Sequence, residues 1–264
     1  MLQLKKSVCL ECLDGPLRQK LEWAARIGAV GVEINARTEV PAESVSRTGI
    51  RQILKWLDDF KLSVAIVSFP TRRGLDDTND LDRRINGIRG AMKLANELGC
   101  RVVSSQGHRL PDAEHAERRQ TLVSVLHDLS RHSLKAGAWL ALRARANSGE
   151  ELAGLLGELP EGAIGIDFDP AGLLLYGHNP VEAMNQLSAS VLHFRARDAV
   201  RDRDMPGGGT EVQLGRGSVD TPALLAGLEE HAYAGYVTVE RHDVQGRSAA
   251  QCAQAMEYLD NLFS

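Results

Sequence analysis

The chain alternates short apolar runs with longer segments in which apolar residues recur every three or four positions. The short runs have the length and composition of buried strands, and the longer segments predict amphipathic helices. Residues 49–60 and 81–99 show the helical spacing most clearly, and Gly99 supplies a stop signal for the second segment. Eight strands are predicted, at residues 7–13, 29–34, 62–69, 101–106, 138–144, 163–169, 191–198 and 236–240.

The regular alternation of strand and helix predicts the fold class. Strands joined by helices run parallel through right-handed crossovers, and eight such units close most naturally into a barrel. We therefore predict a (β/α)8 TIM barrel that forms one domain over residues 1–264. An open doubly wound sheet is the second choice. It is weakened because no GxGxxG motif follows the first strand and the chain has no Walker-type loop.

Composition and charge argue against several classes of function. The formal net charge is −4, which gives no broad attraction to nucleic acid or to an anionic membrane. No apolar run approaches the roughly 18 residues of a membrane helix. The opening MLQLKKSVCL lacks the apolar region of a secretory signal. We expect a cytoplasmic protein that binds neither membrane nor nucleic acid.

Two further features are interpreted as structural. Cys9 and Cys12 have CxxC spacing, but no second pair completes a zinc site, so two half-buried thiols are expected in the first strand. The glycine-dense segment 205–218, MPGGGTEVQLGRGS, predicts a polar loop after the seventh strand. We expect this loop to border the active face of the barrel.

The carboxyl ends of the predicted strands carry the candidate chemistry, because functional residues of such barrels gather there. Side chains two positions apart on a strand share a face, so Arg143 is expected to point with Arg145, and His193 with Arg195 and Arg197. In chain order the polar strand ends are Glu11, Glu33, Ser68, Gln106 with His108, Arg143 with Arg145, Asp167 with Asp169, His193 with Arg195, and Glu240 with Arg241 and His242.

Five segments carry a resemblance to a known family. They are VGVEI, IGIDFDPAGLLLYGHNP, VLHFRARDA, LGRGSVD and GYVTVERHD, in that order along the chain. With the order of elements, they resemble the xylose isomerase-like TIM barrels over nearly the whole length. That superfamily includes sugar isomerases, sugar epimerases, inosose dehydratases and enzymes of the endonuclease IV type. The resemblance implies the same barrel and a small sugar-like substrate.

The resemblance also implies a site for one divalent metal, and here the sequence departs from it. Family members bind the metal through Glu, Asp, His and Glu at the ends of strands five to eight. Those positions fall on Arg143, Asp169, Arg195 and Glu240. A guanidinium group has no lone pair for a metal and stays protonated. We therefore expect no family-type metal and no cofactor, with the two arginines replacing the positive charge of the ion.

Several roles remain open for the candidate residues. Arg143 and Arg195 either clamp an anionic substrate or form salt bridges that only stabilise a decayed metal site. Glu240 and Asp169 are the candidate proton acceptors. Glu240 is alternatively paired with an arginine, which would weaken it as a base. Asp169 precedes Pro170, so it also reads as a helix start.

The remaining candidates are predicted to bind substrate. Glu33 either contributes to the pocket or pairs with a neighbouring arginine. His108 either moves protons at the rim or is solvated. His193 either is a hydrogen-bonded interior residue or reaches the pocket floor, and the deeper Asp167 is interpreted as structural. Arg72 and Arg73 either close over a substrate phosphate or carboxylate or are solvated loop charges. The predicted substrate-binding set is Arg143, Arg195, Arg145, Glu33, His108 and Arg241.

The function predicted from these residues is that of a metal-independent isomerase, epimerase or lyase. It would abstract a proton from a small polyhydroxylated or anionic carbonyl compound, and the arginines would stabilise the resulting oxyanion. The alternative is a non-catalytic barrel that binds a metabolite or a partner and has lost the metal site. A nucleic-acid enzyme of the endonuclease IV type is third, because the arginines preclude its metal cluster. A homo-oligomer is compatible with the sequence.

Overall fold

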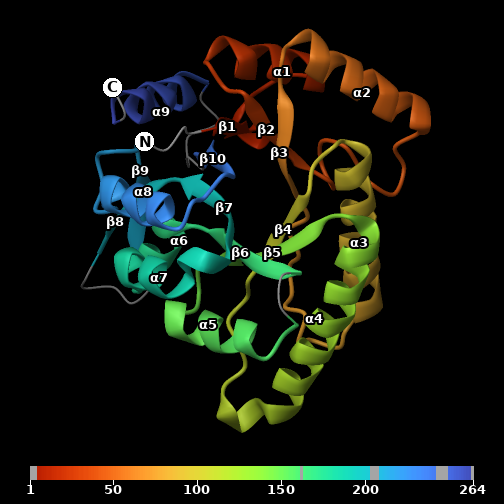
Figure 1. Ribbon diagram of the computed structural model, residues 1–264, viewed down its shortest axis with the longest axis vertical. Helices are drawn as coiled ribbons and strands as arrows, with labels where there is room; N and C mark the ends of the chain where they lie inside the picture. Colours follow the sequence, from red (N-terminus) through yellow and green to blue (C-terminus); the bar gives the residue numbers. More distant parts are fainter. Residues whose placement is uncertain (1–4, 161–162, 203–207, 242–248, 263–264) are drawn as a thin grey trace.

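Each of the eight predicted apolar runs contains a strand of a closed parallel barrel (Figure 1). The computed structural model describes residues 5–160, 163–202, 208–241 and 249–262. Around the barrel the strands follow one another as β1, β10, β7, β6, β5, β4, β3 and β2. The predicted (β/α)8 fold is therefore confirmed. The barrel strands are β1 (Lys5–Cys9), β2 (Gly31–Asn35), β3 (Ser63–Ser68), β4 (Val102–Gln106), β5 (Trp139–Ala144), β6 (Ile164–Phe168), β7 (Val191–Ala196) and β10 (Tyr236–Val239).

Helices surround the strands and cover their outer faces. Figure 1 shows α3 and α4 on the right of the barrel and α7 and α8 on the left. Short polar residues begin several helices: the Ser46 hydroxyl accepts the backbone N–H of Gly49, and Ser148 forms a capping box with Glu151. The α-helices are α1 (Leu17–Arg26), α2 (Arg47–Asp59), α3 (Leu81–Glu97), α4 (Ala116–Ala136), α5 (Gly149–Gly157), α6 (Pro170–Leu175), α7 (Pro180–Leu187), α8 (Thr221–Glu230) and α9 (Ala249–Asn261).

Strand register brings the charged positions of neighbouring strands together. Arg143 on β5 pairs with Asp167 on β6, and Asp167 pairs with His193 on β7. On the other side of β7, Arg195 pairs with Thr238 on β10. Because the strands are parallel, their polar carboxyl ends meet at one mouth of the barrel.

The first predicted strand is shorter than its apolar run. β1 ends at Cys9, and Leu10–Cys12 form a 3-10 turn, η1. Glu11 therefore lies on this turn and not at the end of a strand. Apolar character alone did not separate strand from turn, because Leu10 and Cys12 are both buried in the turn.

The predicted loop at 205–218 is wrong in part. After β7 the chain forms an antiparallel hairpin of β8 (Asp198–Arg201) and β9 (Gly209–Val212), and β9 lies inside the predicted loop. Residues 205–207 lie outside the described part of the chain. The strand was missed because its four residues, Gly-Thr-Glu-Val, lack an apolar alternation long enough to be recognised.

Asp198 organises the turn that follows the hairpin. Its buried carboxylate accepts backbone N–H groups from Ala199, Gly215, Gly217 and Val219, at 2.7–3.1 Å. A Cβ on Gly217 would lie only 2.1 Å from Asp198 Oδ1, so this approach requires glycine. The LGRGS segment of the resemblance thus has a structural explanation, since it binds the aspartate at the end of RARD.

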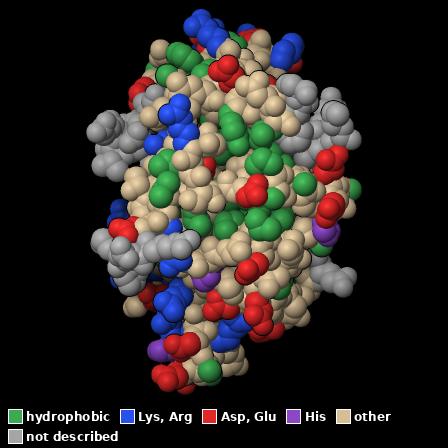
Figure 2. Space-filling model, turned by 90° about the vertical axis from the view of Figure 1, so that its left-hand side faces the viewer, with side chains coloured by type: hydrophobic (Ala, Val, Ile, Leu, Met, Phe, Trp, Pro, Cys, Tyr) green, Lys and Arg blue, Asp and Glu red, His purple; other side chains and the backbone are tan. Residues whose placement is uncertain are grey.

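The outer face that carries α8, α9 and the hairpin is mixed in character. Figure 2 shows hydrophobic side chains in the middle of this face and most of the charged ones toward its upper and lower ends. Val200, on the outer side of β8, is 45% exposed.

None of the helices in the described part of the chain is long and apolar enough to cross a membrane.

Candidate functional site

A pocket of about 150 Å³ lies at the carboxyl ends of the strands. Its lining combines charged residues with small hydroxyl-bearing ones from strands on both sides of the barrel. Four of the predicted site residues, Glu33, Arg143, Arg195 and Glu240, are part of the lining. The complete lining is Glu11, Glu33, Ser68, Pro70, Ser104, Ser105, Gln106, Arg143, Arg195 and Glu240.

Arg143 joins two strand ends through its guanidinium group. Its Nη1 and Nη2 donate to Glu240 Oε1 and Oε2 at 3.1 and 3.0 Å, in the two-pronged geometry that suits arginine and carboxylate. Its Nε donates to Asp169 Oδ2 at 2.9 Å. Burial lowers the pKa of Arg143, and the positive charge of Arg195 lowers it further. The carboxylates of Glu240 and Asp169 more than offset both effects, so the pKa of Arg143 is raised.

Arg195 is buried more deeply, at 1% exposed against 7% for Arg143. Its Nε donates to both oxygens of Asp167, at 3.0 and 2.8 Å. Its Nη1 donates to Glu33 Oε2 at 2.8 Å and to Glu240 Oε2 at 2.5 Å, and its Nη2 to Glu33 Oε1 at 3.3 Å. Burial by itself would lower the pKa of Arg195. The carboxylates of Asp167, Glu240 and Glu33 outweigh this effect and raise the pKa well above its ordinary value. This arginine is held as a cation by three carboxylates.

A third buried arginine, Arg197, was not assigned a role in the site from sequence. Its Nη1 donates to Asp169 Oδ1 and Oδ2 at 2.8 and 2.6 Å, and its Nη2 to Glu211 Oε2 at 2.5 Å. Glu211 is on β9, so the hairpin is tied to the barrel mouth through this ion pair. The two-residue alternation of His193, Arg195 and Arg197 was a usable signal for Arg197. Nothing in the sequence pointed to Glu211.

Asp169 combines the two functions that its sequence context left open. Its Oδ1 accepts the backbone N–H of Gly172 at 2.9 Å, so it caps α6, whose first residue is Pro170. Burial by itself raises the pKa of Asp169, but Arg197 and Arg143 lower it to about 2. Both oxygens are engaged and the side chain is fully buried. This geometry speaks against Asp169 as a proton acceptor.

Asp167 lies beneath the arginines at the centre of a chain of hydrogen bonds across the barrel. Ser104 Oγ donates to Asp167 Oδ2 at 2.5 Å, and His193 Nδ1 lies 2.7 Å from Asp167 Oδ1. The chain continues from His193 Nε2 to Thr238 Oγ1 at 2.5 Å and from there to Ser7 Oγ at 2.5 Å. Burial opposes ionisation, but Arg195 and His193 hold the pKa of Asp167 well below its ordinary value. The interior position predicted for His193 is confirmed.

The four positions that the resemblance assigns to the metal ligands are part of a larger cluster of buried charges. The cluster of buried ion pairs contains four buried carboxylates, and three buried arginines together with the partly buried Arg145 carry a matching number of positive charges. Two of those carboxylates, Glu33 and Asp167, lie outside the four positions that the resemblance assigns to the metal ligands. The carboxylates are Glu33, Asp167, Asp169 and Glu240, and the buried arginines are Arg143, Arg195 and Arg197.

The donor set of this cluster does not fit a divalent cation. The oxygens of Asp169 and Glu240 already accept hydrogen bonds from guanidinium groups. A divalent ion placed about 4 Å from either arginine would be repelled by about 8 kcal/mol at an effective dielectric of 20. In the described ranges, no group of three or more His, Cys, Asp or Glu is arranged to hold a metal ion.

The opposite side of the pocket combines the carboxylate of Glu11 with the hydroxyl groups of Ser68, Ser104 and Ser105. The carboxylate of Glu11 accepts from Asn35 Nδ2 at 2.9 Å and from Thr38 Oγ1 at 3.0 Å. Ser68 is 8% exposed, and its Oγ has no hydrogen-bond partner among the described residues. Ser105 Oγ donates to the carbonyl oxygen of Phe69 at 3.2 Å.

The other predicted substrate-binding residues do not line this pocket. Arg145 is partly exposed, lies 5.9 Å from the ring of Tyr176 and reaches within 3.7 Å of Asp169. Arg241 lies 3.5 Å from Glu211, beneath the hairpin. Its neighbour His242 lies outside the described residues.

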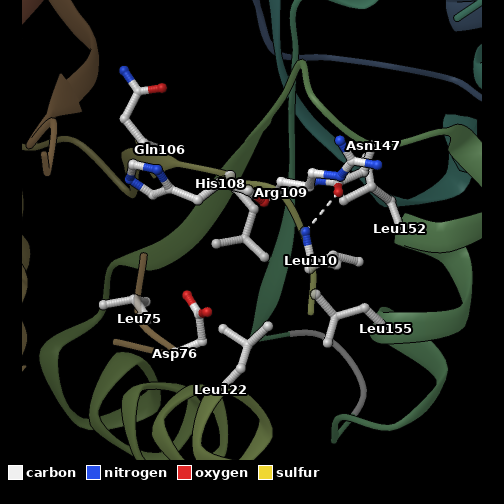
Figure 3. Close-up of a pocket in the computed structure, with 12 residues that line it drawn as sticks. Leu75, Asp76, Gln106, His108, Arg109, Leu110, Leu122, Asn147, Leu152 and Leu155 are labelled. Atoms are coloured by element: carbon white, nitrogen blue, oxygen red, sulfur yellow. Dashed lines mark hydrogen bonds between the residues drawn. The ribbon is translucent and has the colours of Figure 1, made fainter. Parts of the chain in front are cut away.

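His108 lines a separate, smaller cavity of about 20 Å³. Figure 3 shows this cavity surrounded largely by leucines, with Gln106 on the far side of His108 from Leu122. His108 Nε2 lies 3.2 Å from Thr71 Oγ1, and burial lowers the pKa of the imidazole. A space of this size holds about one water molecule. It is too small for the predicted substrate.

Arg72 and Arg73 and the two thiols lie outside the pocket lining, and Cys12 lies in the turn η1 instead of the predicted strand. Arg72 and Arg73 are exposed. Cys9 and Cys12 are free and buried, more fully than predicted. A hydrogen bond with Cys12, together with burial, raises the pKa of Cys9. A hydrogen bond with Cys252 raises the pKa of Cys12. These thiols therefore have little thiolate character.

Comparisons with known proteins agree with this architecture. A family described as xylose isomerase-like TIM barrel matches residues 21–262. A xylose isomerase domain protein from Planctomyces limnophilus superposes with a TM-score of 0.86 at 24% identity, over 98% of this chain and 97% of that chain. None of the curated proteins matches the chain.

Two further solved structures share the fold. The IOLI protein, whose structure contains a zinc atom, has a TM-score of 0.80 at 18% identity, over 98% of both chains. A 3-keto-D-glucoside 4-epimerase from E. coli has a TM-score of 0.78 at 15% identity, over 98% of this chain and all of that chain. At these identities the likeness is one of fold.

Proposed function

The chain belongs to the xylose isomerase-like TIM barrel family, and from this premise we propose that it is a metal-independent isomerase or epimerase. Its substrate is a small polyhydroxylated carbonyl compound that loses a proton from the carbon next to the carbonyl. One observation carries the proposal: Arg143 and Arg195 converge on Glu240 at the pocket, within 3.1 Å. In the proposed reaction this pair of fixed cations takes the place of an electrophilic metal ion.

In this reaction a guanidinium group stabilises the negative charge that develops on the carbonyl oxygen. Arg143 is the better placed donor. Its Nη1 carries two hydrogens and has one acceptor in the described part of the chain, Glu240 Oε1. The second hydrogen is available to a substrate oxygen. Arg195 has every nitrogen engaged by Asp167, Glu33 or Glu240, so we assign it to positioning.

Ion pairing supports a different role for the two carboxylates that were candidate proton acceptors. Both oxygens of Glu240 are bound by guanidinium groups, so accepting a proton would break strong charge-assisted bonds. Asp169 is held in the same way and is excluded from the pocket lining. We propose that Glu240 and Asp169 position the arginines.

Charge in the pocket favours an uncharged substrate. Three lining carboxylates, Glu11, Glu33 and Glu240, face two lining arginines. Because the arginines are already paired, a phosphate or carboxylate group would gain little from them and would approach the acids. Hydroxyl-bearing residues and Gln106 provide donors and acceptors for a polyol. The named 3-keto-D-glucoside epimerase among the structural neighbours supports a keto sugar.

Exchange of substrate hydrogen with solvent tests the proposal. Protein stripped of metal with EDTA is incubated in D2O with D-fructose, D-tagatose or 2-keto-myo-inositol, and deuterium next to the carbonyl is followed by NMR. We expect catalysed exchange that EDTA leaves unchanged. Exchange that disappears with EDTA and returns with Mn²⁺ would overturn metal independence.

A gain-of-metal variant supplies a second readout. The double substitution Arg143→Glu with Arg195→His restores the ligand types that the family resemblance implies. We expect the folded variant, checked by circular dichroism, to bind one Mn²⁺ or Co²⁺ per chain in elemental analysis, and the wild-type protein to bind none. A folded variant without metal would show that the two arginines do not occupy ligand positions.

A non-catalytic binding barrel is the second candidate. The observation that favours it is the extensive internal pairing of Arg143, Arg195 and Arg197, which by itself stabilises the barrel mouth. In that case the same sugars raise the melting temperature of the protein while no deuterium enters them.

A further inference from the structure

The pocket contains one carboxylate that differs from the others. Glu33 and Glu240 are bound by arginines, whereas Glu11 has no cationic partner among the described residues. Within the described ranges, its oxygens accept hydrogen bonds from the neutral groups of Asn35 and Thr38 alone. Glu11 can therefore take up a proton without first breaking an ion pair.

Asn35 fixes the orientation of this carboxylate. Its Oδ1 accepts the backbone N–H groups of Arg37 at 2.8 Å and Thr38 at 3.3 Å, which leaves Nδ2 to donate to Glu11 Oε2. A carboxylate has about four lone-pair sites, and Glu11 uses two of them for these neutral donors. The side chain is thus oriented and still able to accept a proton.

Ser68 provides an independent sign of a ligand beside Glu11. Its hydroxyl lines the pocket, is more than nine-tenths buried, and has no partner in the part of the chain that the structure describes. A buried hydroxyl without a hydrogen bond is costly unless a ligand or water supplies one. Ser68 is also the strand partner of Asn35, which binds Glu11. The unsatisfied hydroxyl and the unpaired carboxylate therefore belong to the same part of the pocket.

We propose that Glu11 is the proton acceptor of the reaction and that Ser68 binds a substrate hydroxyl beside it; this assignment rests on the proposed function. Glu11 takes the proton from the carbon next to the carbonyl, and an O–H bond replaces the C–H bond. The electron pair forms the C=C bond of an enediolate, whose oxygen is stabilised by Arg143. Glu11 exchanges the abstracted proton with solvent. Its proton then adds to the former carbonyl carbon while the proton of the enediolate hydroxyl moves to the former carbonyl oxygen, which gives the isomer. For epimerisation, a solvent proton instead adds to the opposite face of the original carbon and Glu11 releases its proton to solvent; neither path needs an oxidant or reductant.

The same NMR assay tests this assignment with three variants, each checked by circular dichroism. The substrate is whichever of the three carbonyl compounds the wild-type protein exchanges fastest. Glu11→Gln is expected to lower the exchange rate about 10²–10⁴-fold, the range for loss of a general base, and to change the half-saturating concentration much less. Glu11→Asp keeps a carboxylate and is expected to recover part of the rate. Ser68→Ala is expected to raise the half-saturating concentration.

A matched substitution and the wild-type protein separate the outcomes. Glu43→Gln changes the same functional group at an exposed position outside the pocket and is expected to exchange at the wild-type rate. A folded Glu11→Gln variant that keeps more than one tenth of the rate overturns the role of Glu11 and leaves the proposed function intact. Absence of exchange in the wild-type protein overturns the proposed function, and the role of Glu11 with it.

Discussion

The two sides of the pocket are built on different principles. The paired side, formed by Arg143, Arg195 and Glu240 from β5, β7 and the end of β10, has its charged groups bound to one another. The open side, formed by Glu11 and Ser68 from η1 and β3, leaves a carboxylate without a cation and a hydroxyl without a partner within the described residues. One side is satisfied by the protein itself, and the other still requires a ligand.

The comparison of the two sides indicates which charged residues of a pocket are available for chemistry. Burial of several charges is tolerated on the paired side because each guanidinium group is matched by carboxylates. The same matching makes those carboxylates poor bases and occupies every nitrogen of Arg195, whereas Arg143 Nη1 has one acceptor in the described chain and keeps a second hydrogen for a substrate oxygen. The number of charges at the barrel mouth is thus a weak guide to function, and their pairing is a better one.

The largest effect is expected when the paired side loses its central cation. Arg195→Met leaves Glu33, Asp167 and Glu240 without their shared arginine. Removing one partner of a buried ion pair typically costs about 3–5 kcal/mol. We expect a loss of that size in the free energy of unfolding, measured by urea denaturation. Arg51→Met, at an exposed position, serves as the control, and an equal loss in both variants would contradict the interpretation.

A smaller effect is expected from the pH dependence of the same side. Asp169 has its pKa lowered from 3.8 to about 2, so its ion pairs stabilise the fold above about pH 4, and this stabilisation is lost as pH falls toward 2. The shift corresponds to about 2 kcal/mol. We expect the stability difference between wild-type protein and Asp169→Asn to shrink by that amount between pH 4 and 2 in urea titrations.

The control for the acid titration is Asp59→Asn, because Asp59 lies exposed on α2. Its stability difference from the wild-type protein should stay constant over the same interval. A constant difference for Asp169→Asn as well would mean that the ion pairs of Asp169 do not lower its pKa.

The smallest effects are expected when single hydroxyl groups, those of Ser104 and Ser68, are removed. Ser104 Oγ donates to the buried Asp167, so Ser104→Ala should lower the free energy of unfolding by about 1–3 kcal/mol. Ser68 Oγ has no such partner in the described chain, so Ser68→Ala should change it by less than about 0.5 kcal/mol. Urea denaturation of both variants checks the difference. Equal losses would show that Ser68 is bonded within the protein.

The barrel and most of the polar positions at its mouth could be predicted from the sequence alone. Strand and helix periodicity is a local property, so the apolar runs and the polar residues that end them could be read directly. The tight turn at η1 and the short strand β9 escaped detection, since neither has a pattern long enough to distinguish it from its surroundings. The dual role of Asp169 as helix cap and ion-pair partner was visible in part, because Asp-Pro is a local signal.

Which charged groups bind one another depends on the tertiary structure and could not be predicted from the sequence. Arg195 contacts Glu33, which lies 162 positions away in sequence, and Arg143 contacts Glu240 at a separation of 97. These contacts depend on barrel closure and strand register, which no local pattern encodes. For the same reason the sequence could place Glu11 beside the mouth but could not distinguish it from the other acids. Glu11 has no cationic partner among the described residues because Arg143 and Arg195, on distant strands, bind other carboxylates.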